Sequence, residues 1–364
     1  MMKLPSLFKT YFSRKKQNVL FQDAVEGCKE LVVFCIPEFE RINGGILSIF
    51  NLAKYSRMFR KRVIIATLPS VYTYYRNTFF NNDEIIYRFS QIAEVAGSFD
   101  SLMVHIPEYS VKNFCNNLSA KEKESLKKCK DLHFNIMTQN IELAPSNADI
   151  EQLRSISDKL TQTVAHARCA NQDICSSMGI ITHFFGTYLD LSGYAKTPFK
   201  EKKKLILFSP DKSPYKKEIR DLISKFFPSF KVVTVKHMPF DAYVRLVSKA
   251  ICVITFGEGF DGYFLQACEM GTPGIAVYND KFFPDKSWLK LPNIYDSFPA
   301  MIETLAGDLQ ELASNEKLYS DICEVVMKKN KTKDIEKHYI NNIKRFYERD
   351  YDFYPKAYKD ENYI

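Results

Sequence analysis

The stretch that decides the fold runs over residues 255–278 and reads TFGEGFDGYFLQACEMGTPGIAVY. It follows a short apolar run and places Gly257, Gly259 and Gly262 close together. Glycines in such a turn let the backbone approach a ligand closely. A helix is expected over 261–270, so its first N–H groups and positive dipole end follow the turn directly. This arrangement predicts a site for a phosphate or a sugar hydroxyl.

Two polar side chains of this stretch are candidate ligand contacts. Glu258 lies on the turn, and Gln266 lies one to two turns into the expected helix. A carboxylate accepts hydrogen bonds from hydroxyl groups, whereas glutamine keeps hydrogen-bonding capacity without the charge. The remaining members of the expected binding set are Gly259, Phe260, Asp261 and Gly262.

The same strand–loop–helix rhythm surrounds this stretch in both directions. Strands alternating with helices predict parallel sheets covered on both faces. The predicted fold class is therefore α/β, with two Rossmann-like domains whose ligands bind at the carboxyl ends of the strands, facing a central cleft. Strands are expected over 31–36, 62–68, 84–87, 101–106 and 134–138, and then over 205–209, 231–235, 250–255 and 274–278.

A proline-marked basic segment, TPFKEKKK over 197–204, is the expected linker. The predicted organisation is a basic amino-terminal segment over 1–22 and two Rossmann-like domains over 23–198 and 199–364, so that an acceptor can sit on the first and a donor on the second. The chain after residue 300 is expected to be mainly helical, and its last helix is a candidate to cross back to the amino domain. Its aromatic residues are equally well explained by packing; they are Tyr347, Tyr351, Phe353 and Tyr354.

Composition narrows the class of protein. Hydrophobic residues form 46% and charged residues 26% of the 364-residue chain, as is usual for a soluble globular protein. The nine cysteines show no paired spacing, which predicts a reducing, cytoplasmic location without a zinc site. The net charge of +8 fits an anionic ligand or membrane surface, but no nucleic-acid-binding signature is present. Nucleic acid is therefore not an expected partner.

The first 22 residues differ from the rest because they are basic and contain no acidic residue. Their apolar residues recur at helical spacing, which predicts an amphipathic helix. Such a helix favours contact with the anionic inner membrane face through residues 3–16. The alternatives are a frayed terminus and a helix packed on the protein body. The residues concerned are Lys3, Leu4, Leu7, Phe8, Lys9, Tyr11, Phe12, Arg14, Lys15 and Lys16.

The string around Glu258 resembles the EGFG…LEA…GTP segment of retaining group 1 glycosyltransferases, which have the GT-B fold. Glu258 matches the first of two glutamates that this family separates by seven residues, and Gln266 falls on the second. The resemblance covers most of residues 205–280. It implies that Glu258 contacts the transferred sugar as a catalytic residue and that Gln266 holds the ribose of the donor. Glutamine at this place departs from the pattern, which leaves altered donor preference or lost activity open.

The family usually places an arginine and a lysine after the first strand of the carboxyl domain, where they bind the donor diphosphate. The corresponding loop here reads SPDKSPYKK over 209–217 and has no arginine. The resemblance assigns the diphosphate role to Lys212 and Lys216, with Lys217 beside them. Basic groups in this position stabilise charge on the leaving group. The alternative is a solvated helix start with ordinary surface lysines.

The amino-terminal half carries weaker matches to the family. Gly44 and Gly45 resemble the glycine pair through which the amino domain approaches the donor. His105, expected at the end of its strand, resembles a histidine that faces the reacting sugar, and is the second catalytic candidate. Glu38 and Asn140 are weaker candidates on the acceptor side.

The resemblance implies transfer of a sugar from a nucleotide sugar to a glycan acceptor, with retention and without a metal or other cofactor. The expected acceptor is a polyisoprenoid-linked glycan in capsule, O-antigen or cell-wall glycan assembly. A non-catalytic protein that binds a sugar nucleotide or a glycosylation partner is the alternative. A dehydrogenase or epimerase would need GxGxxG after the first strand, but INGGILS stands there.

Overall fold

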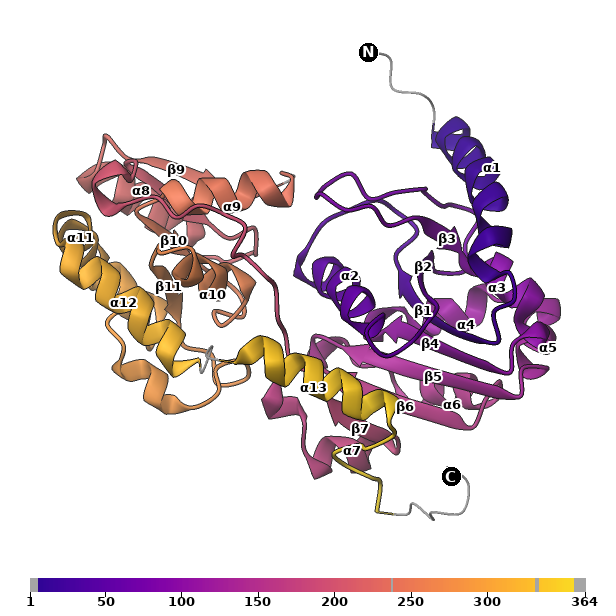
Figure 1. Cartoon of the computed structure of the whole chain (residues 1–364). Coiled ribbons are helices and arrows are strands. Elements are labelled where there is room, and N and C mark those ends of the chain that lie inside the picture. The colour runs from indigo at the N-terminus through magenta and orange to yellow at the C-terminus, as the bar shows by residue number, and fades with distance from the viewer. Residues whose placement is uncertain (1–5, 237, 331–333, 357–364) are drawn as a thin grey trace. The chain divides into compact units, whose positions relative to one another are not determined.

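The computed structural model describes residues 6–236, 238–330 and 334–356, with side chains from Tyr11 onward. It divides into two compact units, which we call unit 1 (Met1–Leu189 and Glu336–Ile364) and unit 2 (Asp190–Ile335). Both are visible in Figure 1. Within the described ranges, no helix combines the length and apolar character needed to cross a bilayer. Lys3 and Leu4, and the side chains of Leu7, Phe8 and Lys9, lie outside the described part.

Unit 1 is built on a seven-stranded parallel sheet in the order β3-β2-β1-β4-β5-β6-β7. The chain adds β2 and β3 on one side of β1 and then β4 to β7 on the other, so the topological switch point lies between β1 and β4. Open α/β sheets bind ligands at the carboxyl ends of the strands next to such a point. The strands are β1 (Glu30–Ile36), β2 (Val63–Thr67), β3 (Ile86–Arg88), β4 (Ser101–Pro107), β5 (Asp131–Thr138), β6 (Lys159–Val164) and β7 (Ile181–Phe184).

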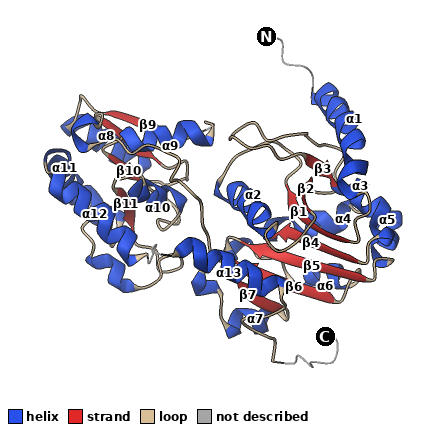
Figure 2. Cartoon of the chain, in the orientation of Figure 1, coloured by secondary structure: helices blue, strands red, loops and turns tan. Residues whose placement is uncertain are grey.

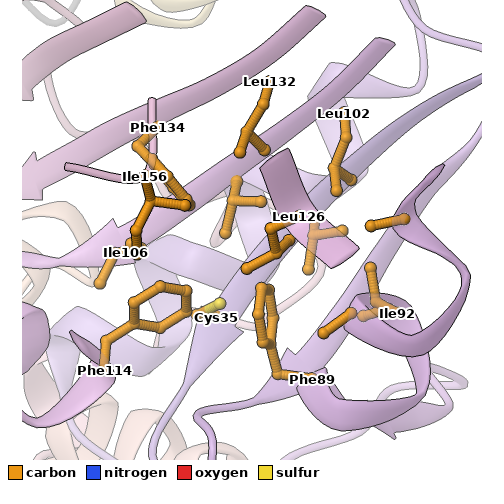
Figure 3. Close-up of a cluster of buried hydrophobic side chains, with 14 of the residues drawn as sticks. Cys35, Phe89, Ile92, Leu102, Ile106, Phe114, Leu126, Leu132, Phe134 and Ile156 are labelled. Atoms are coloured by element: carbon orange, nitrogen blue, oxygen red, sulfur yellow. The ribbon is translucent and has the colours of Figure 1, made fainter. Parts of the chain in front are cut away.

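Helices cover both faces of this sheet, as the unbroken apolar runs of its central strands require. One face packs in the cluster of Figure 3, where Phe89, Phe114 and Phe134 are fully buried. It is covered by α3 (Phe89–Val95), α4 (Val111–Asn117), α5 (Ala120–Lys127) and α6 (Asn147–Arg154). The other face is covered by α2 (Gly44–Ser56) and α13 (Ile335–Tyr347). The short α7 (Gln172–Met178) precedes β7.

The carboxyl-terminal helix α13 is part of unit 1. Ile343 and Phe346 are fully buried against its sheet, and the Tyr347 hydroxyl donates to Ser56 Oγ at 2.9 Å. Phe353 then forms an antiparallel bridge to Thr182 of β7. Tyr347 and Tyr351 therefore pack in the core of unit 1, Phe353 is half-buried, and Tyr354 is exposed.

Helix α1 (Ser6–Val25) is docked on unit 1 by a stripe that the sequence pattern did not mark. The buried Gln17 amide donates to Thr73 Oγ1 at 2.9 Å and to the Ile86 carbonyl at 2.6 Å. One turn later, Phe21 is buried in the hydrophobic cluster on the sheet face that α3 to α6 cover. Tyr11 and Phe12, which were expected on the apolar face, are exposed.

Unit 2 has a five-stranded parallel sheet in the order β12-β11-β10-β8-β9. Its topological switch point lies between β8 and β10. Figure 2 shows the alternation of its strands and helices. The strands are β8 (Leu205–Phe208), β9 (Lys231–Thr234), β10 (Cys252–Ile254), β11 (Gly274–Val277) and β12 (Ile294–Tyr295). The helices are α8 (Lys216–Phe226), α9 (Phe240–Lys249), α10 (Gly262–Glu269), α11 (Phe298–Ser314) and α12 (Glu316–Lys329).

Candidate functional site

A pocket of about 510 Å³ opens on unit 2 where β10, β11 and β12 end. This is the edge at which a parallel sheet presents its loops to ligands, and the volume lies within the usual range for small-molecule sites. The pocket is lined by Thr255, Phe256, Gly257, Gly259, Val277, Tyr278, Asn279, Asp280, Lys286, Leu289, Asp296 and Phe298.

The glycine turn that the sequence singled out forms one wall of this pocket. Gly257 and Gly259 both have left-handed backbone angles, with φ of 72° and 74°. A Cβ on Gly259 would lie 2.6 Å from the Val277 carbonyl oxygen, which no real side chain tolerates. Glycine is therefore required there both by backbone angle and by the close approach of β11.

Helix α10 begins directly after the turn. Asp261 caps it, with Oδ1 accepting from the Phe264 N–H at 3.0 Å. The Gln266 amide folds back toward the helix start, because its Nε2 lies 3.0 Å from where a Cβ on Gly262 would stand. Phe260 differs from the expectation, since its ring is buried in the aromatic core of unit 2 and offers no surface to a ligand.

Three carboxylates gather beside this helix start: Asp211, from the loop after β8, Glu258 and Asp261. Burial raises the pKa of Asp261 well above its usual range, and the negative charges of Asp211 and Glu258 raise it further. The Asp211 Oδ2 atom is buried and has no hydrogen-bond partner among the described residues. The same holds for the hydroxyl of the buried Tyr243, whose ring packs edge-on against Tyr263. These atoms can accept or donate hydrogen bonds that the protein itself does not use.

The two lysines proposed for the diphosphate are placed differently. Lys216 bends back over its own loop, where its ammonium donates to the Ser209 carbonyl and to the Asp211 carbonyl at 2.9 Å. It also lies 5.0 Å from the centre of the Phe256 ring, and burial lowers its pKa. Lys212 is exposed on the same loop. Lys216 therefore holds the loop, whereas Lys212 has the freedom to reach an anion.

On unit 1, the glycine pair forms the first turn of α2. Asn43 caps this helix through a bond of 2.9 Å from the Ile46 N–H. Gly44 is open, but a Cβ on Gly45 would lie 2.2 Å from Gln139 Oε1. The Gln139 amide donates to the Gly45 carbonyl at 3.1 Å. The pair thus brings the α2 backbone against the end of β5.

Glu108 is a residue of this edge that the sequence reasoning missed. It follows β4 directly, is only 2% exposed, and accepts from the Asn140 N–H at 3.0 Å through Oε1. Its Oε2 has no partner among the described residues. Burial raises the pKa of Glu108 to about 7, against the lowering effect of backbone donors that include the Gln139 N–H. A glutamate immediately after the buried SLMVHIP strand was the available signal.

His105 does not lie at the strand end where it was expected. It stands inside β4, is fully buried, and stacks on Phe34 with 4.2 Å between ring centres. Its Nδ1 lies 2.9 Å from Asn135 Nδ2, and burial followed by the charge of His133 lowers its pKa. With α13 packed over it through Phe346, His105 is a core residue without access to a substrate.

The two weaker acceptor-side candidates lie at the same edge as Glu108. Asn140 is positioned by the Glu108 bond, and its own side chain accepts from the Glu142 N–H at 2.9 Å. Glu38 follows β1 and is half-buried. At the end of β6, His166 bonds to the Gln139 backbone, and burial lowers its pKa. In the described part of the chain, no set of three or more His, Cys, Asp or Glu residues is arranged to hold a metal ion.

Comparison with known proteins gives a match in structure but none in sequence. No protein-family model and no curated protein sequence matches the chain. An alpha-glucosyltransferase in complex with UDP-glucose and DNA containing an abasic site is similar at a TM-score of 0.53 and 12% identity, covering 81% of this chain and 93% of that one. The same enzyme type with UDP and a 13-mer DNA containing a HMU base gives a TM-score of 0.56 and 9% identity, covering 86% and 94%.

At such identities the likeness concerns the fold alone. Both relatives are matched over nearly their whole length, so the likeness includes both parallel sheets. The chain therefore has the α/β fold of the GT-B glycosyltransferases, with parallel sheets of seven and five strands.

Proposed function

We propose that the chain is a glycosyltransferase that takes a nucleoside-diphosphate sugar on unit 2. The observation that carries this proposal is the pocket at the ends of β10, β11 and β12, walled by the turn in which Gly259 cannot be replaced. It adjoins the start of α10, whose N–H groups and dipole favour an anionic group. UDP and UDP-glucose are bound by the two structurally similar enzymes, so uridine donors are the first to test.

Each part of a nucleotide sugar has a group of matching chemistry on unit 2, but Glu258, Gln266, Asp211 and Lys212 stand on the turn, on α10 and on the loop after β8 and do not belong to the pocket lining. The half-buried Phe298 ring lines the pocket and offers an apolar face for a base. Lys212 supplies a positive charge for the diphosphate, and Gln266 an amide for the ribose. Glu258 and Asp211 supply carboxylate oxygens that accept from sugar hydroxyls.

The proposed reaction is substitution at the anomeric carbon with retention. The acceptor oxygen forms a bond to this carbon while the bond to the diphosphate oxygen breaks, and the acceptor proton passes to the departing diphosphate on the same face. Lys212 and the α10 start stabilise the charge on the leaving group, so that no metal is required. Orientation and exclusion of water provide the remaining rate enhancement.

The proposed acceptor is a glycan, carried on a polyisoprenoid lipid in surface polysaccharide or cell-wall glycan assembly. The basic amino-terminal helix supports a membrane-linked acceptor. A non-catalytic protein that binds a sugar nucleotide remains the second candidate, because Gln266 replaces the family glutamate and the loop after β8 has no arginine.

The test is titration calorimetry with UDP-, GDP-, dTDP- and CMP-sugars, on the wild type and on Glu258→Ala. Glu311→Ala, an exposed glutamate on α11, is the matched control. We expect one donor class to bind, with affinity reduced roughly tenfold by Glu258→Ala and unchanged by the control. Donor hydrolysis or transfer, followed by NMR of the product anomer, separates the enzyme from the non-catalytic candidate.

The absence of binding by every donor and by the free nucleotides would overturn the donor site. Binding without turnover in the presence of membrane extracts would favour the non-catalytic protein. An inverted product anomer would contradict the same-face mechanism while leaving the site intact.

A further inference from the structure

Large exposed hydrophobic side chains gather at one corner of unit 1. Tyr11 and Phe12 of α1 are 63% and 56% exposed, and Val71, in the loop after β2, is 70% exposed. Beside Val71, Tyr72 is 41% exposed and packs against Phe39, which is 57% exposed, with 5.4 Å between ring centres. We call these five residues the α1 patch.

Direct contacts join the two parts of the α1 patch, helix α1 and the loop after β2. Arg14 donates to the Val71 carbonyl, and Lys16 lies 4.8 Å from the centre of the Tyr75 ring. The buried Gln17 amide fixes the same loop through Thr73. The loop after β2 therefore runs along α1, so the exposed side chains of both belong to a single surface.

Docking of α1 leaves a defined outer side. Because Gln17 and Phe21 are buried, the opposite side of the helix faces solvent and carries Phe12, Lys16 and Val19 at helical spacing. Val19 is 67% exposed. The exposed Asp23 continues this side one turn after Val19, so the apolar and basic residues occupy only its first part.

The charge of this surface is complementary to anionic headgroups. Arg14, Lys15 and Lys16 follow the exposed aromatic pair after Ser13, and residues 6–22 contain no acidic residue. Aromatic side chains settle at the boundary between headgroups and acyl chains, while lysines pair with lipid phosphates. Lys15 and Lys16 are both exposed.

A nucleic acid would use the same positive charge, and the structurally similar enzymes were seen with DNA. The apolar members of the surface distinguish the two partners. Bases stack on aromatic rings, but the aliphatic Val71 and Val19 offer no stacking face. Both side chains are more exposed than any aromatic residue of the α1 patch. An apolar lipid boundary is the environment that such side chains favour.

We propose that the α1 patch is a peripheral membrane-binding surface for anionic lipid, in which the apolar side chains enter the headgroup boundary and Lys15 and Lys16 pair with phosphates. The surface lies entirely on unit 1, and the proposal does not depend on the sugar donor. Residues outside the amino-terminal segment, Phe39, Val71 and Tyr72, are part of it.

The test is co-sedimentation of the full chain with vesicles of phosphatidylcholine alone and of phosphatidylcholine mixed with phosphatidylglycerol. We expect binding only to the mixed vesicles, and weaker binding at high salt. Phe12→Ser with Val71→Ser, and separately Lys15→Glu with Lys16→Glu, are each expected to weaken binding by roughly tenfold or more. The matched control is Lys225→Glu with Phe226→Ser, an exposed basic and aromatic pair on α8 of unit 2.

The variants are expected to stay folded because Arg14 and Gln17, which dock α1, are left in place. An unchanged circular dichroism spectrum and an unchanged unfolding midpoint would confirm this. Failure to bind mixed vesicles overturns the proposal, and so does binding that the α1 patch variants keep. The partner would be nucleic acid and not lipid if a labelled single-stranded DNA binds the wild type, the same variants weaken that binding, and vesicles do not displace the DNA. Donor binding by calorimetry is expected to be unaffected in all variants, which separates this proposal from the proposed function.

Discussion

The carboxyl edges of the two sheets use their polar groups in opposite ways. On unit 1, Glu108 bonds to Asn140 and Gln139 bonds to Gly45, so the loops close the edge against each other, although Glu108 Oε2 has no partner among the described residues. On unit 2, the edge holds an open pocket of about 510 Å³, with Asp211 Oδ2 left without a partner among the described residues. Two sheets of similar architecture thus differ in whether the loops at their carboxyl edge bond across it or leave a pocket between them.

The largest effect is expected from Gly259→Ala, which fills the closest backbone approach of the unit 2 edge. The new Cβ would meet the Val277 carbonyl at 2.6 Å on a residue with φ of 74°. We expect a loss of about 2–4 kcal/mol in the unfolding free energy of unit 2. Fluorescence of Trp288, the single tryptophan of the chain, reports the denaturant unfolding of this unit.

Gly307→Ala is the control for this substitution. Gly307 lies within α11, and a Cβ there meets nothing within 4 Å. It is expected to stabilise unit 2 by about 0.5–1 kcal/mol because alanine favours a helix. Equal effects of the two substitutions would mean that the approach of β11 to the turn is looser than the structure has it.

Glu108→Gln tests whether the closed edge of unit 1 rests on a buried acid. The pKa of Glu108 is raised from 4.5 to about 7, so the folded state holds its proton more tightly than the unfolded state. The stability gained from the protonated form is fully present below about pH 4.5 and is lost as the pH rises through about 7. Across this window the wild type should lose about 3 kcal/mol relative to Glu108→Gln.

The measurement is denaturant unfolding by circular dichroism at a series of pH values, with Trp288 fluorescence marking the transition of unit 2. Glu94→Gln, an exposed glutamate on α3, is expected to show no such pH dependence. Parallel stability curves for the wild type and Glu108→Gln would show that the carboxyl of Glu108 is not held in a protonated state.

The comparison also explains what the sequence could predict. Local sequence patterns predict the glycine turn, α10 and the strands of unit 2 from β8 to β11. Unbroken apolar runs and glycines can be interpreted from a few neighbouring residues. Strand β6 reads KLTQTV, and its polar side chains hide a buried strand. Thr161 and Thr163 are satisfied by Asn135 of the neighbouring strand, at 2.9 Å each, a pairing that only the fold reveals.

The same reason explains why the sequence misjudged the surroundings of some candidate site residues. The sequence pattern placed His105 at an accessible strand end because it does not define the exact residue at which β4 ends. The helix that covers His105, α13, comes from far along the chain. Lys212 and Lys216 cannot be told apart by spacing, since only the folded loop shows that Lys216 turns back onto carbonyl oxygens.

Those two lysines provide a third test. Lys216→Met removes two bonds that hold the loop after β8, so a loss of about 1–2 kcal/mol in unit 2 stability is expected. Lys212→Met should change stability by less than about 0.5 kcal/mol, because the side chain is exposed. Under the proposed function it should nevertheless weaken donor binding roughly tenfold. The reverse pattern, with Lys212 needed for stability, would contradict the placement of both side chains.

The smallest effects are expected from two buried tyrosines that differ in whether their hydroxyl is used. On unit 1, Tyr347→Phe removes the bond of 2.9 Å to Ser56 and leaves a buried hydroxyl unpaired, so a loss of about 1 kcal/mol is expected. On unit 2, the Tyr243 hydroxyl is buried without a partner among the described residues. Tyr243→Phe therefore removes an unsatisfied group, and should leave stability unchanged or raise it by up to about 1 kcal/mol. The measurement is the thermal unfolding midpoint of both variants. If Tyr243→Phe lowers the midpoint more than Tyr347→Phe does, the Tyr243 hydroxyl has a hydrogen-bond partner in solution, and this difference between the two units does not hold.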